Sequence, residues 1–177
     1  MESVSLSAAE RPALLHEYFE RAARNWPDRV AIEVPPGIDR NERVTVTFKQ
    51  LDEVASSIAA YLSAYVKAEC IVAILLPRTS FHLYACQVGV LKSGAAYTCI
   101  DPNFPDEQLR EILKDSEAVV LLTNSQGIER ARQLGYDNAF DVTGDLPSEL
   151  TLAAPAWLND RNLAYIIYTS GTTGRPK

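Results

Sequence analysis

The feature that most constrains the fold is a series of short apolar runs that alternate with segments of helical periodicity. The run Cys70–Leu76 contains no polar side chain, is rich in β-branched residues and stops at Pro77, which predicts a strand buried on both faces. Ala95–Ile100 and Ala118–Leu122 are further strand candidates. Because candidate helices follow these strands, the order predicts an α/β fold with a largely parallel, helix-covered sheet and right-handed crossovers.

Capping and turn residues divide the rest of the chain. Thr47-Phe48-Lys49-Gln50 has the capping-box pattern and predicts a helix to about Lys67. A helix from Pro12 to about Asn25 would carry one apolar stripe, made of Leu14, Leu15, Tyr18, Phe19 and Ala22. The other predicted helices cover 80–91, 105–113 and 125–134, and the other predicted strands cover 30–34, 44–46, 139–142 and 163–168. Residues 1–11 are expected to be a lead-in, and 143–161 a connecting loop.

Composition excludes several classes of protein. The 177 residues are 47% hydrophobic, enough for one domain with a sizeable core, and the net charge of −6 argues against a nucleic-acid partner. No signal peptide precedes the helices, and no apolar run is long enough to span a membrane, so we expect a cytoplasmic protein with no membrane partner.

Cysteine and histidine usage gives no sign of a metal centre or a hydrolase. The three cysteines (Cys70, Cys86 and Cys99) are widely spaced, which favours buried thiols and predicts no metal site. His16 is expected to be a packing or capping residue, and neither it nor His82 belongs to a pattern typical of a hydrolase.

The last nine residues concentrate chemistry that suits phosphate. Gly171 and Gly174 allow main-chain N–H groups to converge on an anion, and Lys177 supplies a positive charge. Hydroxyl donors come from four further residues, Thr169, Ser170, Thr172 and Thr173. Because the segment follows a predicted strand, these residues would lie where α/β sheets bind ligands.

This loop is not a Walker loop, because Pro176 precedes the lysine and the glycine spacing is too short. We expect a loop that closes over a triphosphate, in place of a cradle fixed at a helix end. The alternative reading is a flexible, hydroxyl-rich surface turn, which is what most short Ser/Thr/Gly runs are.

The segment Tyr168–Lys177 resembles the signature loop of the adenylate-forming superfamily, which includes acyl-CoA synthetases, luciferases and nonribosomal peptide synthetase adenylation domains. Leu91–Pro102 and Phe48–Leu51 resemble two core motifs of the peptide synthetase domains, and Leu15–Phe19 with Asn25–Asp28 resembles their usual beginning. The sequence at Thr98-Cys99-Ile100 departs from the commoner valine-proline-leucine type. Gly94, Tyr97, Asp101 and Pro102, within the second motif, are expected to shape a helix–strand–turn connection.

The resemblance implies that residues 12–177 are the incomplete N-terminal part of the large domain of an adenylate-forming enzyme, truncated inside the phosphate-binding loop. It implies an ATP- and Mg²⁺-dependent reaction in which an amino acid becomes an aminoacyl adenylate and is loaded onto the phosphopantetheine thiol of a peptidyl carrier protein domain. Contacts to the β- and γ-phosphates would come from Thr169, Ser170, Gly171, Thr172, Thr173, Gly174 and Lys177.

Catalytic residues are expected downstream of residue 177, in the rest of the adenylation domain, so this chain alone is predicted to be inactive. Two alternatives stay open from the sequence. One is a fragment of an acyl- or aryl-CoA ligase, and the other, from a different class, is a non-catalytic nucleotide-binding module.

Overall fold

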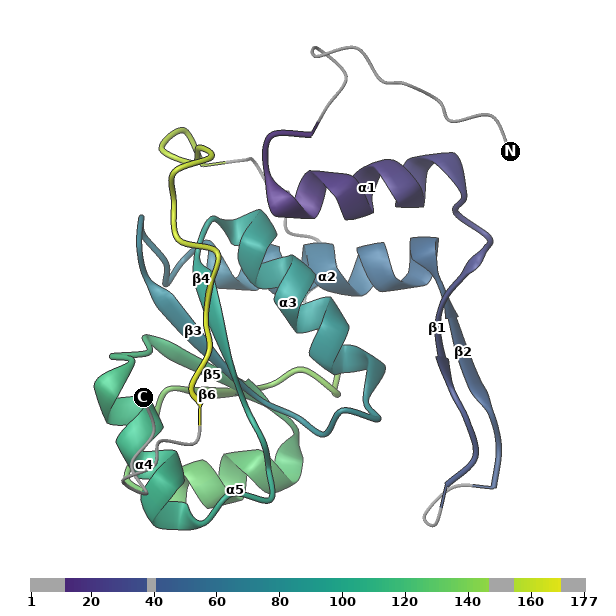
Figure 1. Ribbon diagram of the computed structural model, residues 1–177. Coiled ribbons are helices and arrows are strands. Elements are labelled where there is room, and N and C mark those ends of the chain that lie inside the picture. The colour runs from purple at the N-terminus through teal and green to yellow at the C-terminus, as the bar shows by residue number, and fades with distance from the viewer. Residues whose placement is uncertain (1–11, 38–40, 147–154, 170–177) are drawn as a thin grey trace.

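The computed structural model describes residues 12–37, 41–146 and 155–169, and they form two sheets with helices packed against them (Figure 1). The larger sheet has five strands in the order β6-β5-β3-β4-β7, and every neighbouring pair is parallel. Its strands are β3 (Ile71–Leu75), β4 (Ala96–Ile100), β5 (Val120–Thr123), β6 (Ala139–Asp141) and β7 (Tyr165–Ile166). The predicted largely parallel α/β fold is confirmed.

The smaller sheet is an antiparallel hairpin of β1 (Val30–Val34) and β2 (Val44–Thr47). It stands to one side of the main sheet in Figure 1. Val46 of β2 is buried in the hydrophobic cluster that also contains residues of α2 and α3, called here the first core cluster. The main sheet is covered on both faces, because β3 alternates between two cores. Val72 and Ile74 join the cluster that contains α2 and α3, whereas Ala73 joins the one that contains α4 and α5.

The helices are α1 (Leu15–Asn25), α2 (Phe48–Leu62), α3 (Phe81–Ser93), α4 (Asp106–Asp115) and α5 (Ser125–Gln133). The predicted capping box at α2 is confirmed, since the Thr47 hydroxyl accepts from the Gln50 amide at 3.2 Å and the Gln50 side chain accepts from the Thr47 amide at 2.9 Å. Helices α2 and α3 pack closely at Gly89, where an added Cβ would lie 2.7 Å from the carbonyl oxygen of Ala55.

Two helix predictions need correction. Helix α2 ends at Leu62, not near Lys67, because the amides of Tyr65 and Val66 both donate to the Leu62 carbonyl and close a turn there. Helix α1 begins at Leu15, not at Pro12, and its predicted apolar stripe is only partly buried, since Leu15 and Tyr18 are 52% and 54% exposed. Helix α1 rests on α2 and α3 at one end of the sheet, and no other described helix or strand covers its outer side.

A buried lysine joins α1, α2 and α3. Lys92 is 6% exposed, and its ammonium lies 2.7 Å from an oxygen of Asp52, 3.0 Å from the hydroxyl of Ser56 and 3.3 Å from an oxygen of Glu20. The three partners come from two different helices, α1 and α2. A cation that is removed from water in this way needs such partners, so the cluster fixes how the helices meet.

The expectation of three buried thiols is wrong for Cys99. Cys86 is buried and Cys70 is partly buried, but Cys99 near the carboxyl end of β4 is exposed, with the Gln87 amide 3.3 Å from its sulfur. The pairing of β4 with β7 reaches only Tyr97 and Thr98, so the strand extends beyond its neighbour at Cys99.

Candidate functional site

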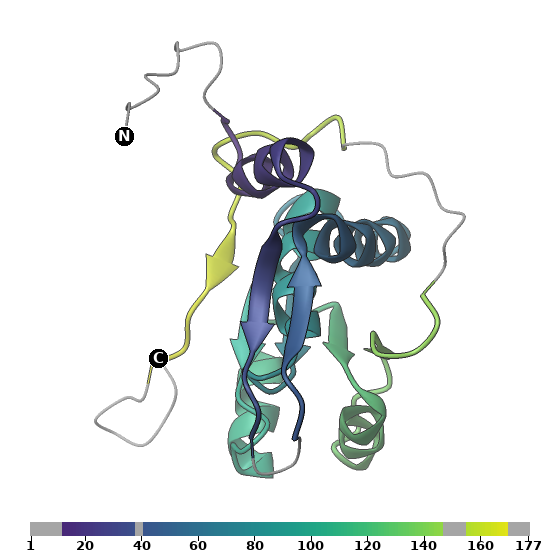
Figure 2. The same ribbon diagram turned by 90° about the vertical axis from the view of Figure 1, so that its right-hand side faces the viewer.

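The predicted phosphate loop begins at the carboxyl end of edge strand β7. This strand runs parallel to β4, with Tyr165 opposite Tyr97 and Ile166 opposite Thr98, and Figure 2 shows it at the margin of the sheet. It is shorter than the predicted 163–168, although the Tyr97 amide also donates to the Ala164 carbonyl at 3.1 Å. The chain therefore leaves β7 at the sheet edge where parallel α/β proteins bind ligands.

Of the predicted phosphate-contact residues, Thr169 is exposed and follows β7 at this edge. The others lie outside the described residues: Ser170, Gly171, Thr172, Thr173, Gly174 and Lys177. Their contact with phosphate remains a prediction from the residue types and from the strand that precedes them.

Tyr168, the residue that leads into the loop, is hydrogen-bonded to the end of helix α4. Its hydroxyl donates to a carboxylate oxygen of Asp115, the last residue of α4, at 2.6 Å, and its ring packs against the second core cluster. Burial, and then the adjacent carboxylate, raise the pKa of Tyr168 to about 12. Sequence reasoning missed this contact, because nothing in the pattern links positions 53 residues apart.

A pocket of about 240 Å³ lies at the same edge, between the carboxyl ends of β3 and β4. Leu76, Leu83 and Ile100 form part of its wall, and Arg78 and Asp101 add charged groups. The turn expected at Asp101 and Pro102 is confirmed, since a carboxylate oxygen of Asp101 accepts from the Asn103 amide at 2.9 Å. Arg130 of α5 holds the next part of the turn by donating to the carbonyls of Pro102 and Phe104.

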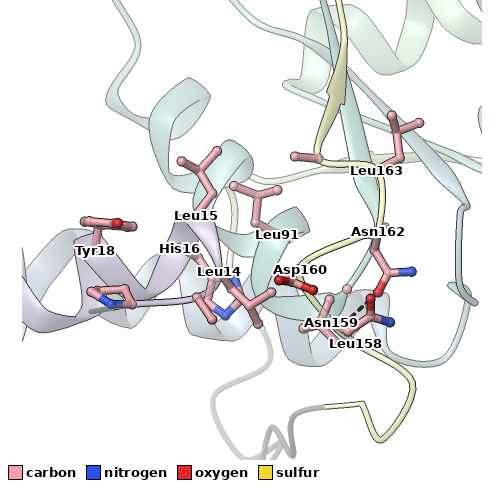
Figure 3. A pocket seen from close by; sticks show the side chains of 15 residues that line it. Leu14, Leu15, His16, Tyr18, Leu91, Leu158, Asn159, Asp160, Asn162 and Leu163 are labelled. Carbon is pink, nitrogen blue, oxygen red and sulfur yellow. Dashed lines mark hydrogen bonds between the residues drawn. The ribbon is translucent and has the colours of Figure 1, made fainter. Parts of the chain in front are cut away.

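A second pocket, of about 350 Å³, lies at the other end of the strands (Figure 3). Ala95 and Ala164, which line it, precede β4 and β7, so the pocket is at the amino edge of the sheet. Its walls combine Leu14, Leu15 and Leu91 with three polar residues, Asn159, Asp160 and Asn162. Because this pocket lies at the amino edge of the sheet and the predicted phosphate loop follows the carboxyl end of β7, the pocket does not belong to the predicted phosphate site.

Within the described ranges, no group of three or more His, Cys, Asp and Glu side chains converges as a metal site. In the same ranges, no helix has the length and apolar character needed to cross a membrane. His82 lies with its Nδ1 3.5 Å from the Ser80 hydroxyl, which is long for the contact between a nucleophile and its base.

Both histidines should make stability fall in mild acid. Burial lowers the pKa of His82, a shift that Asp141 partly opposes, and burial also lowers the pKa of His16. The folded chain therefore binds protons less readily than the unfolded chain, whose histidines have the ordinary pKa near 6.5. We expect the free energy of unfolding to decrease as the pH falls below about 6.5. Urea titrations at pH 7 and pH 5 should show a smaller decrease in His82→Gln, and equal decreases would contradict this assignment.

Comparison with known proteins agrees with the fold. The model of the family described as "AMP-binding enzyme" matches residues 19–177. A plipastatin synthase protein of Bacillus subtilis (strain 168) is 38% identical over 174 residues, which cover 98% of this chain but only 6% of that protein.

Solved structures share the architecture. The crystal structure of a fatty acid AMP ligase from Legionella pneumophila matches 98% of this chain and 31% of that chain, with a TM-score of 0.80 at 23% identity. A crystal structure of a nonribosomal peptide synthetase matches 89% of this chain and 16% of that one, with a TM-score of 0.73 at 25% identity. With its parallel sheet and a family match over residues 19–177, the chain belongs to the AMP-binding enzyme family.

Proposed function

We propose that this chain supplies the triphosphate-binding loop of an enzyme that activates an amino acid as its adenylate. The observation that carries the proposal is that Thr169, the first residue of the phosphate-loop sequence, follows a parallel edge strand at the carboxyl edge of the sheet. In this position, main-chain N–H groups and hydroxyls can face a ligand beyond the strand ends. The 38% identity to a plipastatin synthase favours an amino acid over a fatty acid, because the ligase similarity, at 23% identity, supports the fold alone.

The chemical requirement is stabilisation of charge on the departing pyrophosphate. Residues Thr169, Ser170, Thr172 and Thr173 would donate hydrogen bonds to phosphate oxygens, and Lys177 would neutralise part of their charge. Mg²⁺ bound with ATP would neutralise charge on the same phosphates. Gly171 and Gly174 would let the main chain approach the phosphates closely.

Transfer to a carrier completes the proposed activity. The aminoacyl group would pass from AMP to the phosphopantetheine thiol of a carrier protein domain, as the similarity to a nonribosomal peptide synthetase structure supports. We place the enzyme in the cytoplasm. The groups that contact the amino acid and the adenine belong, in this proposal, to the rest of the adenylation domain.

Calorimetric titration of the chain with Mg-ATP tests the role of the loop. We expect weak, saturable binding that Lys177→Ala weakens by about tenfold, because a hydrogen bond from a charged donor contributes on the order of 1.5 kcal/mol. Lys67→Ala is the matched control, since Lys67 is an exposed lysine that precedes β3 at the amino edge of the sheet. It should change the affinity by less than about twofold, in line with the weak interactions of exposed charges.

Equal effects of the two lysine substitutions would contradict the proposed loop. The chain alone should also give no amino-acid-dependent ATP–pyrophosphate exchange, and turnover in that assay would contradict the assignment of catalysis to the rest of the domain.

A further inference from the structure

Strand β7 is attached to the sheet by few main-chain contacts. It pairs with β4 at two positions, and two of its neighbouring side chains point outward, with Tyr165 47% and Ile167 69% exposed. Ile166 and Tyr168 point the other way and pack against the second core cluster. The position of the chain at the end of β7 therefore depends on side chains as well as on the short ladder.

Side-chain hydrogen bonds hold both ends of this segment. At the amino end, a carboxylate oxygen of Glu69 accepts from the Asn162 side chain at 2.8 Å and from the Leu163 amide at 3.3 Å. At the carboxyl end, Tyr168 donates to Asp115 at 2.6 Å. The second contact lies one residue before Thr169, where the predicted phosphate loop begins.

The acceptor belongs to a helix that is packed in the core and held at its other end by an ion pair. Asp115 ends α4, which is buried in the second core through Leu109 and Ile112. The other end of α4 is held from α5, where the Arg130 guanidinium lies 2.7 Å from a carboxylate oxygen of Asp106. With its pKa raised to about 12, the Tyr168 hydroxyl keeps its proton and remains a donor throughout the physiological pH range.

We propose that Tyr168 is a positioning residue for the phosphate loop, and that its hydrogen bond to Asp115 fixes the point from which the loop leaves the sheet. This inference rests on the proposed function, because it assumes that the loop binds triphosphate. It identifies a residue that acts on ligand affinity through the main chain, without contact between its own side chain and the phosphates.

Tyr136 provides a matched control in the same core cluster. Its hydroxyl donates to the Ala118 carbonyl at 2.5 Å, and burial raises its pKa to about 12 as well. This bond joins the segment after α5 to the residues before β5, so it involves no residue of β7 or of the phosphate loop. Tyr136→Phe and Tyr168→Phe therefore each remove one hydroxyl that packs on the same core cluster, but only Tyr168→Phe removes a bond next to Thr169.

Two measurements on the full chain separate positioning from general stability. Amide hydrogen exchange should accelerate by about threefold to tenfold at residues 166–169 in Tyr168→Phe and stay unchanged there in Tyr136→Phe, as expected for the loss of one local hydrogen bond. Mg-ATP affinity should fall by a similar factor in Tyr168→Phe only.

The partner residue supplies the rescue test. Asp115→Asn keeps an acceptor oxygen and should bind Mg-ATP nearly as the parent chain does, whereas Asp115→Ala should reproduce Tyr168→Phe. The double variant of Tyr168→Phe and Asp115→Ala should be no weaker than either single variant, because both remove the same bond.

Equal exchange rates at residues 166–169 in the two tyrosine variants would overturn the positioning role. Faster exchange in Tyr168→Phe with unchanged Mg-ATP affinity would overturn it too, since the bond would then order the strand without serving the ligand. If the parent chain binds no Mg-ATP, the proposed function and the positioning role that depends on it both fail, whereas ATP binding that is insensitive to Tyr168→Phe removes the positioning role alone.

Discussion

Replacement of Lys92 by methionine is expected to lower the free energy of unfolding by about 2–3 kcal/mol, measured by urea denaturation at pH 7. Methionine keeps most of the apolar stem but leaves Asp52 and Glu20 without the cation between them. Loss of one partner from a fully buried ion pair costs about 3–5 kcal/mol. The value here is smaller because the Asp52 and Glu20 side chains are 34% and 28% exposed and stay partly hydrated.

Arg132→Met is the control for this prediction. Arg132 forms an ion pair with Glu129 at 2.8 Å, but both side chains are about two-thirds exposed, at 64% and 67%. Such a surface pair contributes little, so the loss should stay below about 0.5 kcal/mol. Addition of Asp52→Asn to Lys92→Met should restore part of the stability by removing one of the uncompensated charges. Losses of equal size in Lys92→Met and Arg132→Met would show that the buried cluster does not hold the helices together.

Gly94→Ala is expected to lower the free energy of unfolding by about 2–4 kcal/mol, through two separate effects. Gly94 ends α3 with a φ of 85°, a conformation in which a Cβ is strained. An added Cβ would also lie 2.4 Å from Cη2 of Trp157, so the indole would have to move. Urea denaturation measures the total, and a change in tryptophan emission should report the displaced indole.

Gly135→Ala separates the two effects. Gly135 follows the C-cap of α5 with a φ of 77°, and no atom lies within 4 Å of the position that an added Cβ would take. This variant should lose only the conformational part, about 1 kcal/mol, with no change in tryptophan emission. The collision with Trp157 is ruled out if Gly94→Ala and Gly135→Ala lose the same stability.

Local patterns in the sequence predicted most of the elements, because the relevant interactions are local. The capping box at Thr47 requires only Gln50, three residues away, and the uninterrupted apolar run around β3 requires burial on both faces whatever its neighbours are. The end of α2 was missed because the turn at Leu62 interrupts an apolar pattern that continues to Tyr65.

Contacts between distant segments could not be predicted in the same way. An apolar stripe shows that Leu15 and Tyr18 can be buried, but not whether another layer covers them, and the structure leaves them exposed. Lys92 would be expected on the surface from its residue type, and only the convergence of α1, α2 and α3 explains its burial. For the candidate site, residue types predicted the chemistry of the loop, whereas its attachment through Tyr168 and Asp115 emerged only from the fold.

The strand order has a consequence for chain entropy at the site. Tyr165 pairs with Tyr97 across roughly 70 residues of sequence, whereas Ala96 pairs with Ile71 across roughly 25. Closing the longer loop costs about 0.9 kcal/mol more, and β7 has only two paired positions to offset it, against five between β3 and β4. Strand β7, which precedes the phosphate loop, thus combines the fewest paired positions in the sheet with the largest cost of loop closure. A ligand that bridges β7 to the rest of the sheet would therefore stabilise the fold at its weakest strand pairing.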